Sequence, residues 1–181
     1  TVVDRRNHHL FQPMLYQVAT AGLNAADVAH PIRGLFHGQR NLHVERAEVV
    51  GVDWDARVLH LADERDLPFD QLVVAVGAVA TWFGVPGAEQ HATPLYTLED
   101  VVRVQNHVPE GFDSADADHE LIDAGEVNFV IVGGGPTGVE TAGALAELFS
   151  VVFKRDYPTL CFGRACVLLV ETRDALLGPF H

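Results

Sequence analysis

The stretch that decides the fold runs Val127-Asn128-Phe129-Val130-Ile131-Val132-Gly133-Gly134-Gly135-Pro136-Thr137-Gly138. A mostly apolar run leads into a glycine turn that fits G-x-G-x-x-G, and an apolar-periodic segment continues to about Phe149. Strand, glycine turn and helix in this order are the context in which the motif binds a dinucleotide. We therefore expect a buried strand at 127–132, a turn at 133–138 that receives a pyrophosphate, and then a helix to about Phe149.

Three glycines of the motif have separate physical reasons. Gly133 permits the tight turn, Gly135 lets the pyrophosphate approach the backbone because it has no Cβ, and Gly138 lets the helix pack close to the strand. The helix N-terminus adds N–H groups and a partial positive charge for the phosphates. The remaining motif positions are assigned to the same NAD site: Gly134, Pro136 and Thr137.

An acid ends the next expected strand, residues 167–170. Glu171 can accept hydrogen bonds from both hydroxyls of an adenosine ribose, and its charge would repel a 2′-phosphate, which favours NAD over NADP. Arg173 lies close enough in sequence to weaken that preference. The spacing from the glycines is longer than the usual ~20 residues, and an insertion at 150–165, expected as a loop or broken helix, accounts for it. A glycine turn without ligand and a solvated acid remain the alternatives.

The first half of the chain is expected to contain more strand. Two imperfectly alternating runs, 44–52 and 58–61, flank Asp53-Trp54-Asp55 and predict an antiparallel hairpin. Residues 72–76 are continuously apolar and β-branched, which predicts a strand buried on both faces and ended by Gly77.

The middle of the chain predicts a helix and then a link. Thr97-Leu98-Glu99-Asp100 resembles a capping box, so a helix is expected from there to about His107, stopped by Pro109. Residues 110–125 are acidic and are expected to be turn-rich. Strands alternating with a helix indicate an α/β chain with a parallel sheet.

The composition of the chain excludes several classes of protein and partner. The chain has 181 residues, 48% of them hydrophobic, and a net charge of −13. Such a chain is globular, and its negative charge argues against nucleic acid as a partner. Two cysteines, Cys161 and Cys166, are too few for a disulfide scaffold. No apolar run approaches the ~20 residues of a membrane span, so we expect this piece to be soluble.

A second nucleotide site is indicated at the start of the chain. Thr1-Val2-Val3-Asp4 reads as the end of a strand closed by an acid, as Glu171 closes its own. Asp4 would then bind a second ribose. Two dinucleotide sites in one chain indicate electron transfer between the nucleotides, and NADH with a flavin is the usual pair. Both ends of the chain look cut, so we expect an internal piece of a longer protein.

Four segments carry a family resemblance. They are Asp4-Arg5-Arg6-Asn7-His8-His9-Leu10-Phe11-Gln12-Pro13-Met14-Leu15-Tyr16-Gln17-Val18-Ala19-Thr20, Leu72 to Gly77, Phe83 to Gly87 and Gly133 to Glu140. Together they closely resemble type II NADH dehydrogenases, the single-subunit NADH:quinone oxidoreductases. The resemblance implies a Rossmann-like flavoprotein fold that binds two dinucleotides, FAD and NAD, and is incomplete here at both ends. It implies a partial FAD domain at 1–108, a linker at 109–125 and a partial NADH domain at 126–181.

The resemblance also implies roles for matching residues. In the FAD site, Asp4 would bind the adenosine ribose with Arg5 beside it, and Ala47 would hold the adenine through its backbone. The other FAD contacts would come from Gln12, Pro13, Ala75 and Gly77, with Val76 where the family has threonine. Glu140, near the start of the helix, would point toward the flavin and nicotinamide, where it would orient the nicotinamide or relay a proton. An acid favoured by the helix dipole is the alternative for Glu140.

The activity implied is hydride transfer from NADH to FAD and electron transfer to a membrane quinone, without proton pumping. The parent protein would lie peripherally on the cytoplasmic side of the membrane through a C-terminal part outside this chain. It would bind no metal and could form a homodimer, and the isolated fragment would be inactive. Three alternatives stay open: a cysteine-independent ferredoxin or rubredoxin reductase, a dinucleotide-binding module without turnover, and a dehydrogenase with NAD alone.

Overall fold

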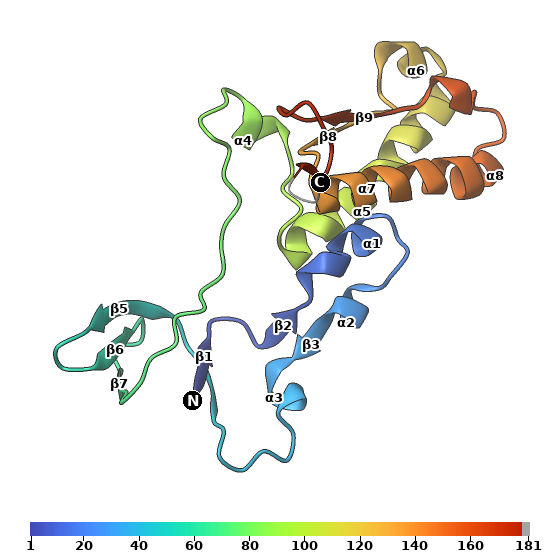
Figure 1. Cartoon of the computed structure of the whole chain (residues 1–181). Coiled ribbons are helices and arrows are strands. Elements are labelled where there is room, and N and C mark those ends of the chain that lie inside the picture. Colours follow the sequence, from blue (N-terminus) through green and yellow to red (C-terminus); the bar gives the residue numbers. More distant parts are fainter. Residues whose placement is uncertain (179–181) are drawn as a thin grey trace. The chain divides into compact units, whose positions relative to one another are not determined.

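The computed structural model describes residues 1–178 and arranges them as short strands and helices in two compact units (Figure 1). The first unit comprises Thr1–Leu10 and Ala29–Ala80, and the second comprises Phe11–Val28 and the chain from Thr81 onward. The two nucleotide-binding roles expected for residues 1–108 and 126–181 stay predictions.

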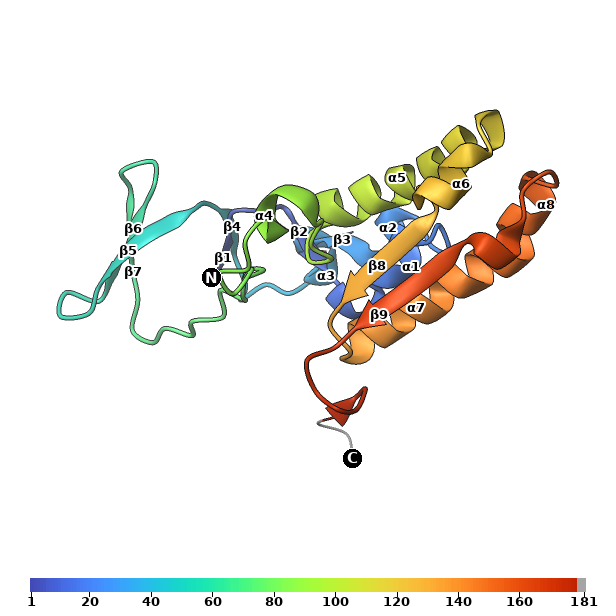
Figure 2. The same cartoon turned by 90° about the horizontal axis from the view of Figure 1, so that it is seen from above.

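The second unit contains the expected parallel pair of strands. β8 (Asn128–Val132) pairs in parallel with β9 (Cys166–Val170), with Asn128 opposite Cys166. Helix α7 (Pro136–Glu147) connects them and packs on both strands (Figure 2). The strand–helix–strand order predicted from the glycine turn is confirmed.

The helix expected to end near Phe149 continues further. It passes through a π-helix, η2 (Leu148–Phe153), into α8 (Lys154–Asp156). A turn and the 3₁₀ helix η3 (Phe162–Arg164) then lead to β9. Residues 150–165, expected as a loop or broken helix, therefore contain the end of this helix, a turn and η3. Phe149 and Phe153 are buried and keep the helix against the core.

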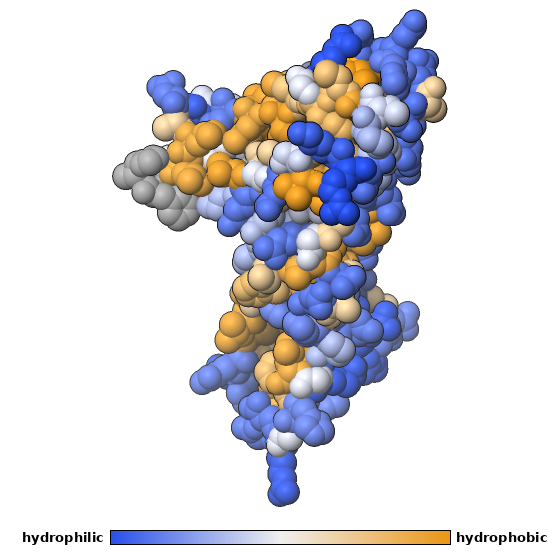
Figure 3. Space-filling model, turned by 90° about the vertical axis from the view of Figure 1, so that its right-hand side faces the viewer, coloured by the Kyte–Doolittle hydropathy of each residue, from blue (hydrophilic) through white to orange (hydrophobic). Residues whose placement is uncertain are grey.

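Only one face of β8, which was expected to be a buried strand, packs against the core. Phe129 and Ile131 pack against the hydrophobic core, but Val130 and Val132 on the opposite face are exposed. Leu168 and Val170 on β9 are exposed as well. Alternate residues of a strand face opposite sides, and in the described chain helices cover only one side. Figure 3 shows one face of the molecule, with hydrophobic side chains gathered in its upper part.

Helix α5 (Leu98–Ala117) forms the other side of this core. The predicted capping box is confirmed: Asp100 N–H donates to the Thr97 hydroxyl at 3.1 Å, and Thr97 N–H donates to the Asp100 carboxylate at 2.8 Å. The predicted stop at Pro109 was wrong, because the helix runs through the proline. A buried stripe of Val108, Phe112 and Ala115 holds it in place.

Residues 110–125 were expected to be turn-rich and are instead largely helical. They form the end of α5 and then α6 (Glu120–Ala124), which closes on Gly125 in the left-handed conformation. Their acids bind the segment that follows α8: Tyr157 donates to Asp113 at 2.7 Å, Thr159 donates to Asp116, and Arg164 pairs with Asp123. We call these three contacts the acidic clasp.

The rest of the second unit is short helices. The 3₁₀ helix η1 (Gln12–Met14) leads into α1 (Leu15–Ala19), which packs against α5 and α7. Helices α2 (Ala25–Val28) and α4 (Ala88–His91) complete the helical elements. Within the described residues, no helix is both long enough and apolar enough to cross a membrane.

The first unit is built from three small sheets. β1 (Val2–Asp4) pairs in parallel with β4 (Val44–Arg46), and β2 (His8–Leu10) pairs antiparallel with β3 (Ala29–Pro31), which precedes α3 (Ile32–Leu35). The remaining strands form an antiparallel meander of β5 (Val49–Asp53), β6 (Val58–Leu61) and β7 (Asp66–Pro68). The hairpin around residues 53–55 is confirmed, although the run at 44–52 divides between β4 and β5.

The buried strand predicted at 72–76 was wrong. Residues 72–76 form no strand, and Val73 and Val76 are 86% and 88% exposed. A strand needs a neighbouring strand for its backbone hydrogen bonds, and no strand of residues 1–178 pairs with this segment. Gly77 does change the chain direction, since its φ is +73°.

Candidate dinucleotide site

The turn between β8 and α7 is as tight as the glycines predict. Gly133 has a φ of +114°, and its N–H donates to the Val170 carbonyl at 2.8 Å, which joins the turn to the end of β9. A Cβ at Gly138 would collide with the Gly133 carbonyl oxygen and would lie 3.4 Å from Leu169 Cδ1. The close packing expected of Gly138 is therefore observed.

Gly135 is the open point of the loop. It is the N-cap of α7, and a Cβ built on it would meet no atom within 4 Å. The first turn of α7 presents the N–H groups of Thr137 and Gly138, while Pro136 has none to offer. An open backbone in front of a helix N-terminus fits a pyrophosphate in both space and charge.

Glu171 lies at the mouth of this loop. Its Oε2 accepts a hydrogen bond from Gly134 N–H at 2.7 Å. Its Oε1 accepts from Thr172 N–H at 2.7 Å, the Thr172 hydroxyl at 3.0 Å and Arg173 N–H at 3.1 Å. These donors, Gly134 N–H foremost, lower the pKa of Glu171 to about 2. The carboxylate is therefore charged at neutral pH and can accept from a sugar hydroxyl.

The sequence did not reveal that residues after β9 fold back onto the loop. Leu177 N–H donates to the Gly134 carbonyl at 2.8 Å, and Leu176 lies against Gly134. The one residue in the sequence that could have indicated this contact is Gly134. The motif leaves that position open to any residue, yet this chain has a glycine there.

Glu140 lies on α7, two residues after the last glycine of the motif, and its side chain is exposed. Close by, the buried Thr141 hydroxyl donates to the Thr137 carbonyl at 2.6 Å, which ties it to the first turn. The catalytic role of Glu140 stays a prediction.

In the first unit, three of the residues assigned to FAD come together at the end of β1. The Asp4 carboxylate accepts from Arg6 N–H at 2.8 Å, and the Asp4 carbonyl accepts from Ala47 N–H at 3.1 Å. The Arg46 guanidinium donates to the Arg5 carbonyl at 3.4 Å. Because the Ala47 N–H is bound to Asp4, its carbonyl is the backbone group left for an adenine.

Four further residues are assigned to FAD. Ala75 and Gly77 lie in the exposed segment that follows residue 72. Gln12 and Pro13 belong to η1 of the second unit, where the Gln12 amide donates to the Tyr96 carbonyl at 3.3 Å. Within the first unit the structure brings together Asp4, Arg5 and Ala47, and the FAD contacts of all seven residues stay predictions.

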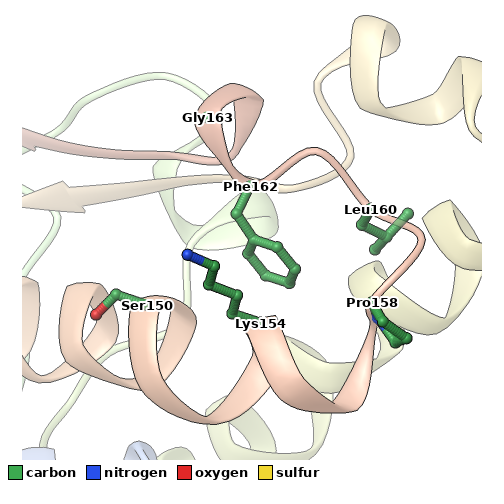
Figure 4. A pocket seen from close by; sticks show the side chains of 6 residues that line it. All are labelled: Ser150, Lys154, Pro158, Leu160, Phe162 and Gly163. Carbon is green, nitrogen blue, oxygen red and sulfur yellow. The ribbon is translucent and has the colours of Figure 1, made fainter.

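A separate pocket of about 490 Å³ lies at the other end of the α7–η2–α8 helix (Figure 4). It is lined by Ser150, Lys154, Pro158, Leu160, Phe162 and Gly163. Fourteen helical residues span roughly 20 Å, so this pocket is distinct from the glycine loop at the start of α7.

The chain is similar in sequence to known proteins. The sequence profile described as pyridine nucleotide-disulphide oxidoreductase matches residues 1–181. The chain is 31% identical to the type II NADH:quinone oxidoreductase Ndh of Mycobacterium tuberculosis over 98% of its length, and 33% identical to NdhA of the same organism over 99%. It covers 39% of each, so the chain spans about two fifths of these curated relatives.

A solved structure shows the same fold. NDH2 of Plasmodium falciparum, determined in complex with NADH, matches 98% of this chain with a TM-score of 0.86, at 20% identity and over 37% of its own length. The expected two-dinucleotide flavoprotein fold and the resemblance to type II NADH dehydrogenases are both confirmed. The chain belongs to the pyridine nucleotide-disulphide oxidoreductase family.

Proposed function

We propose that the protein containing this chain is an FAD-dependent NADH:quinone oxidoreductase that does not pump protons. The observation that carries the proposal is the open Gly135 backbone at the N-terminus of α7, with the Glu171 carboxylate beside it. The names of the curated relatives support NADH and quinone as substrates. When bound, FAD supplies the step between them, since a flavin accepts a hydride and passes electrons on singly or in pairs.

The glycine loop would hold NADH by its adenosine and phosphates. The Gly135 backbone and the α7 N-terminus would receive the pyrophosphate, and Glu171 would accept a hydrogen bond from the adenosine ribose. A charged Glu171 would repel a 2′-phosphate. We therefore propose NADH rather than NADPH as the donor.

Seven residues would bind FAD. Asp4 would bind the adenosine ribose with Arg5 beside it, and Ala47 would bind the adenine through its carbonyl. The flavin end would be contacted by Gln12, Pro13, Ala75 and Gly77. Glu140 would orient the nicotinamide or hold a proton near the reacting rings.

We propose a peripheral location on the cytoplasmic side of the membrane, reached through a part of the protein outside this chain. Quinones dissolve in the bilayer, so the electron acceptor requires contact with a membrane surface. A homodimer is the proposed assembly.

The test uses the purified full-length protein. It should show flavin absorbance and oxidise NADH steadily with a soluble quinone, and far more slowly with ferredoxin or rubredoxin. Faster turnover with ferredoxin or rubredoxin would show that this iron–sulfur protein, and not a quinone, is the electron acceptor. Bleaching of bound flavin by one equivalent of NADH without turnover would make the protein a binding module, and a protein without flavin would overturn the proposal.

A further inference from the structure

One segment of the chain holds Gly134 from both sides. Gly134 N–H donates to Glu171 Oε2 at 2.7 Å, and its carbonyl accepts from Leu177 N–H at 2.8 Å. Both partners belong to residues 171–178, which we call the strap. The polar backbone groups of this buried glycine are thus bound within the protein itself.

The strap also fills the space beside Gly134. A Cβ at Gly134 would lie 2.7 Å from Leu176 Cδ2 and 2.9 Å from Glu171 Oε2, closer than real Cβ contacts allow. At Gly135 the same construction meets open space. Two adjacent glycines therefore serve different purposes, because Gly134 makes room for the strap and Gly135 makes room for a ligand.

Backbone strain in the strap lies at its contact with the loop. Leu177 has a φ of +55°, in the left-handed region that a leucine rarely adopts. Such a conformation persists where surrounding structure imposes it, and it clusters at functional sites. Here the strained residue is the one whose N–H reaches the Gly134 carbonyl.

Most of the acceptor capacity of Glu171 is already used. A carboxylate accepts about four hydrogen bonds, two at each oxygen. Oε1 already has three donors, from Thr172 and Arg173, whereas Oε2 has only Gly134 N–H. Room remains at Oε2 for a single additional donor.

We propose that Glu171 and the strap are positioning elements that hold the glycine loop in its phosphate-receiving shape before a nucleotide binds, and that Glu171 accepts one ribose hydroxyl rather than two. The proposal rests on the proposed function, because it assumes that the loop receives NADH. A loop ordered in advance binds more tightly, since less conformational entropy is lost on binding.

The first experiment needs no nucleotide. Amide hydrogen exchange is measured on the full-length protein and on Glu171→Gln, in which an NH₂ group must face some of the backbone donors. We expect the Gly134 amide to exchange at least tenfold faster in the variant, with core amides of α5 unchanged. Gly143→Ala, on the open side of α7, is the matched control and should leave Gly134 protected. Equal exchange in wild type and Glu171→Gln would overturn the positioning role.

The second experiment separates positioning from ribose binding. Calorimetry compares NADH with an analogue that lacks both hydroxyls of the adenosine ribose. If Glu171 acted on the ribose alone, Glu171→Gln would bind this analogue as tightly as wild type does, and that result would overturn the proposal. We expect the variant to bind it at least tenfold more weakly. A wild-type protein that binds neither compound would refute the proposed function, while the exchange experiment still decides the role of the strap.

Discussion

Gly135 and Gly138 stand three residues apart, yet a methyl group added at each would meet different surroundings. At Gly138 it would strike the Gly133 carbonyl, which is backbone and cannot rotate away. We expect Gly138→Ala to lower the free energy of unfolding by about 1–3 kcal/mol, as overpacking does, measured by urea denaturation. Gly135→Ala should leave folding unchanged and weaken NADH binding.

Gly143→Ala is the control for the variants Gly135→Ala and Gly138→Ala. It should stabilise α7 by roughly 0.5–1 kcal/mol, because alanine restricts the unfolded chain and favours the helix. Equal loss of stability in Gly135→Ala and Gly138→Ala would contradict the distinction between an open and a closed position.

The charge of Glu171 gives stability a defined dependence on pH. Its pKa is lowered from 4.5 to about 2 by the donors of Gly134, Arg173 and Thr172. A lowered carboxyl pKa contributes stability that is fully present above pH 4.5 and is lost as the pH falls through 2. Unfolding followed from pH 6 to 2 should therefore show a smaller decline in Glu171→Gln than in wild type. Parallel curves for the two proteins would contradict this assignment.

Among the helices and strands, α5 contains a residue that disfavours its own secondary structure, Pro109. It lies inside α5 and removes one N–H from the helix. We expect Pro109→Ala to raise the free energy of unfolding by about 1–3 kcal/mol, since proline is roughly 3 kcal/mol worse than alanine in a helix interior. Asn106→Ala, an exposed change in the same helix, should raise it by less than about 0.7 kcal/mol. Urea denaturation of both variants checks the difference.

The sequence predicted those elements whose signals are local. The capping box at Thr97, the glycine turn after Val132 and the hairpin after Asp53 each depend on neighbouring residues, and all three are present. It failed where packing decides. The stripe that includes Phe112 carries α5 past Pro109, and residues 72–76 form no strand without a partner to pair with.

In the candidate site, too, the features that depend on neighbouring residues could be predicted and the long-range contacts could not. The roles of Gly133 and Gly138 in the turn follow from the motif, and the structure shows both. The contacts of Gly134 with Leu176 and Leu177 join residues some forty positions apart, and no short motif encodes such a pairing.

At the scale of the whole chain, many large apolar side chains are exposed to solvent. Residues 72–79 and the outer face of β8 and β9 present valine and leucine side chains to solvent. Patches of this kind bind hydrophobic dyes and partners. We expect the 181-residue chain to bind anilinonaphthalene sulfonate strongly, and the double variant Val130→Thr, Val132→Thr to bind less. The control variant Leu121→Thr, at a partly buried position, should have little effect on dye binding. Equal dye fluorescence with the wild-type chain and the double variant would contradict this account.

The acidic clasp has a consequence for the order of folding. Its hydrogen bonds join residues 44 and 43 positions apart, so chain entropy must be lost in closing a long loop before either contact forms. Helix α5, by contrast, is built from local contacts. Leu160, buried beside the clasp, should therefore pack after the rate-limiting step. In stopped-flow kinetics Leu160→Ala should accelerate unfolding and leave the refolding rate nearly unchanged, which would make the clasp the last part of this unit to close and the first to open.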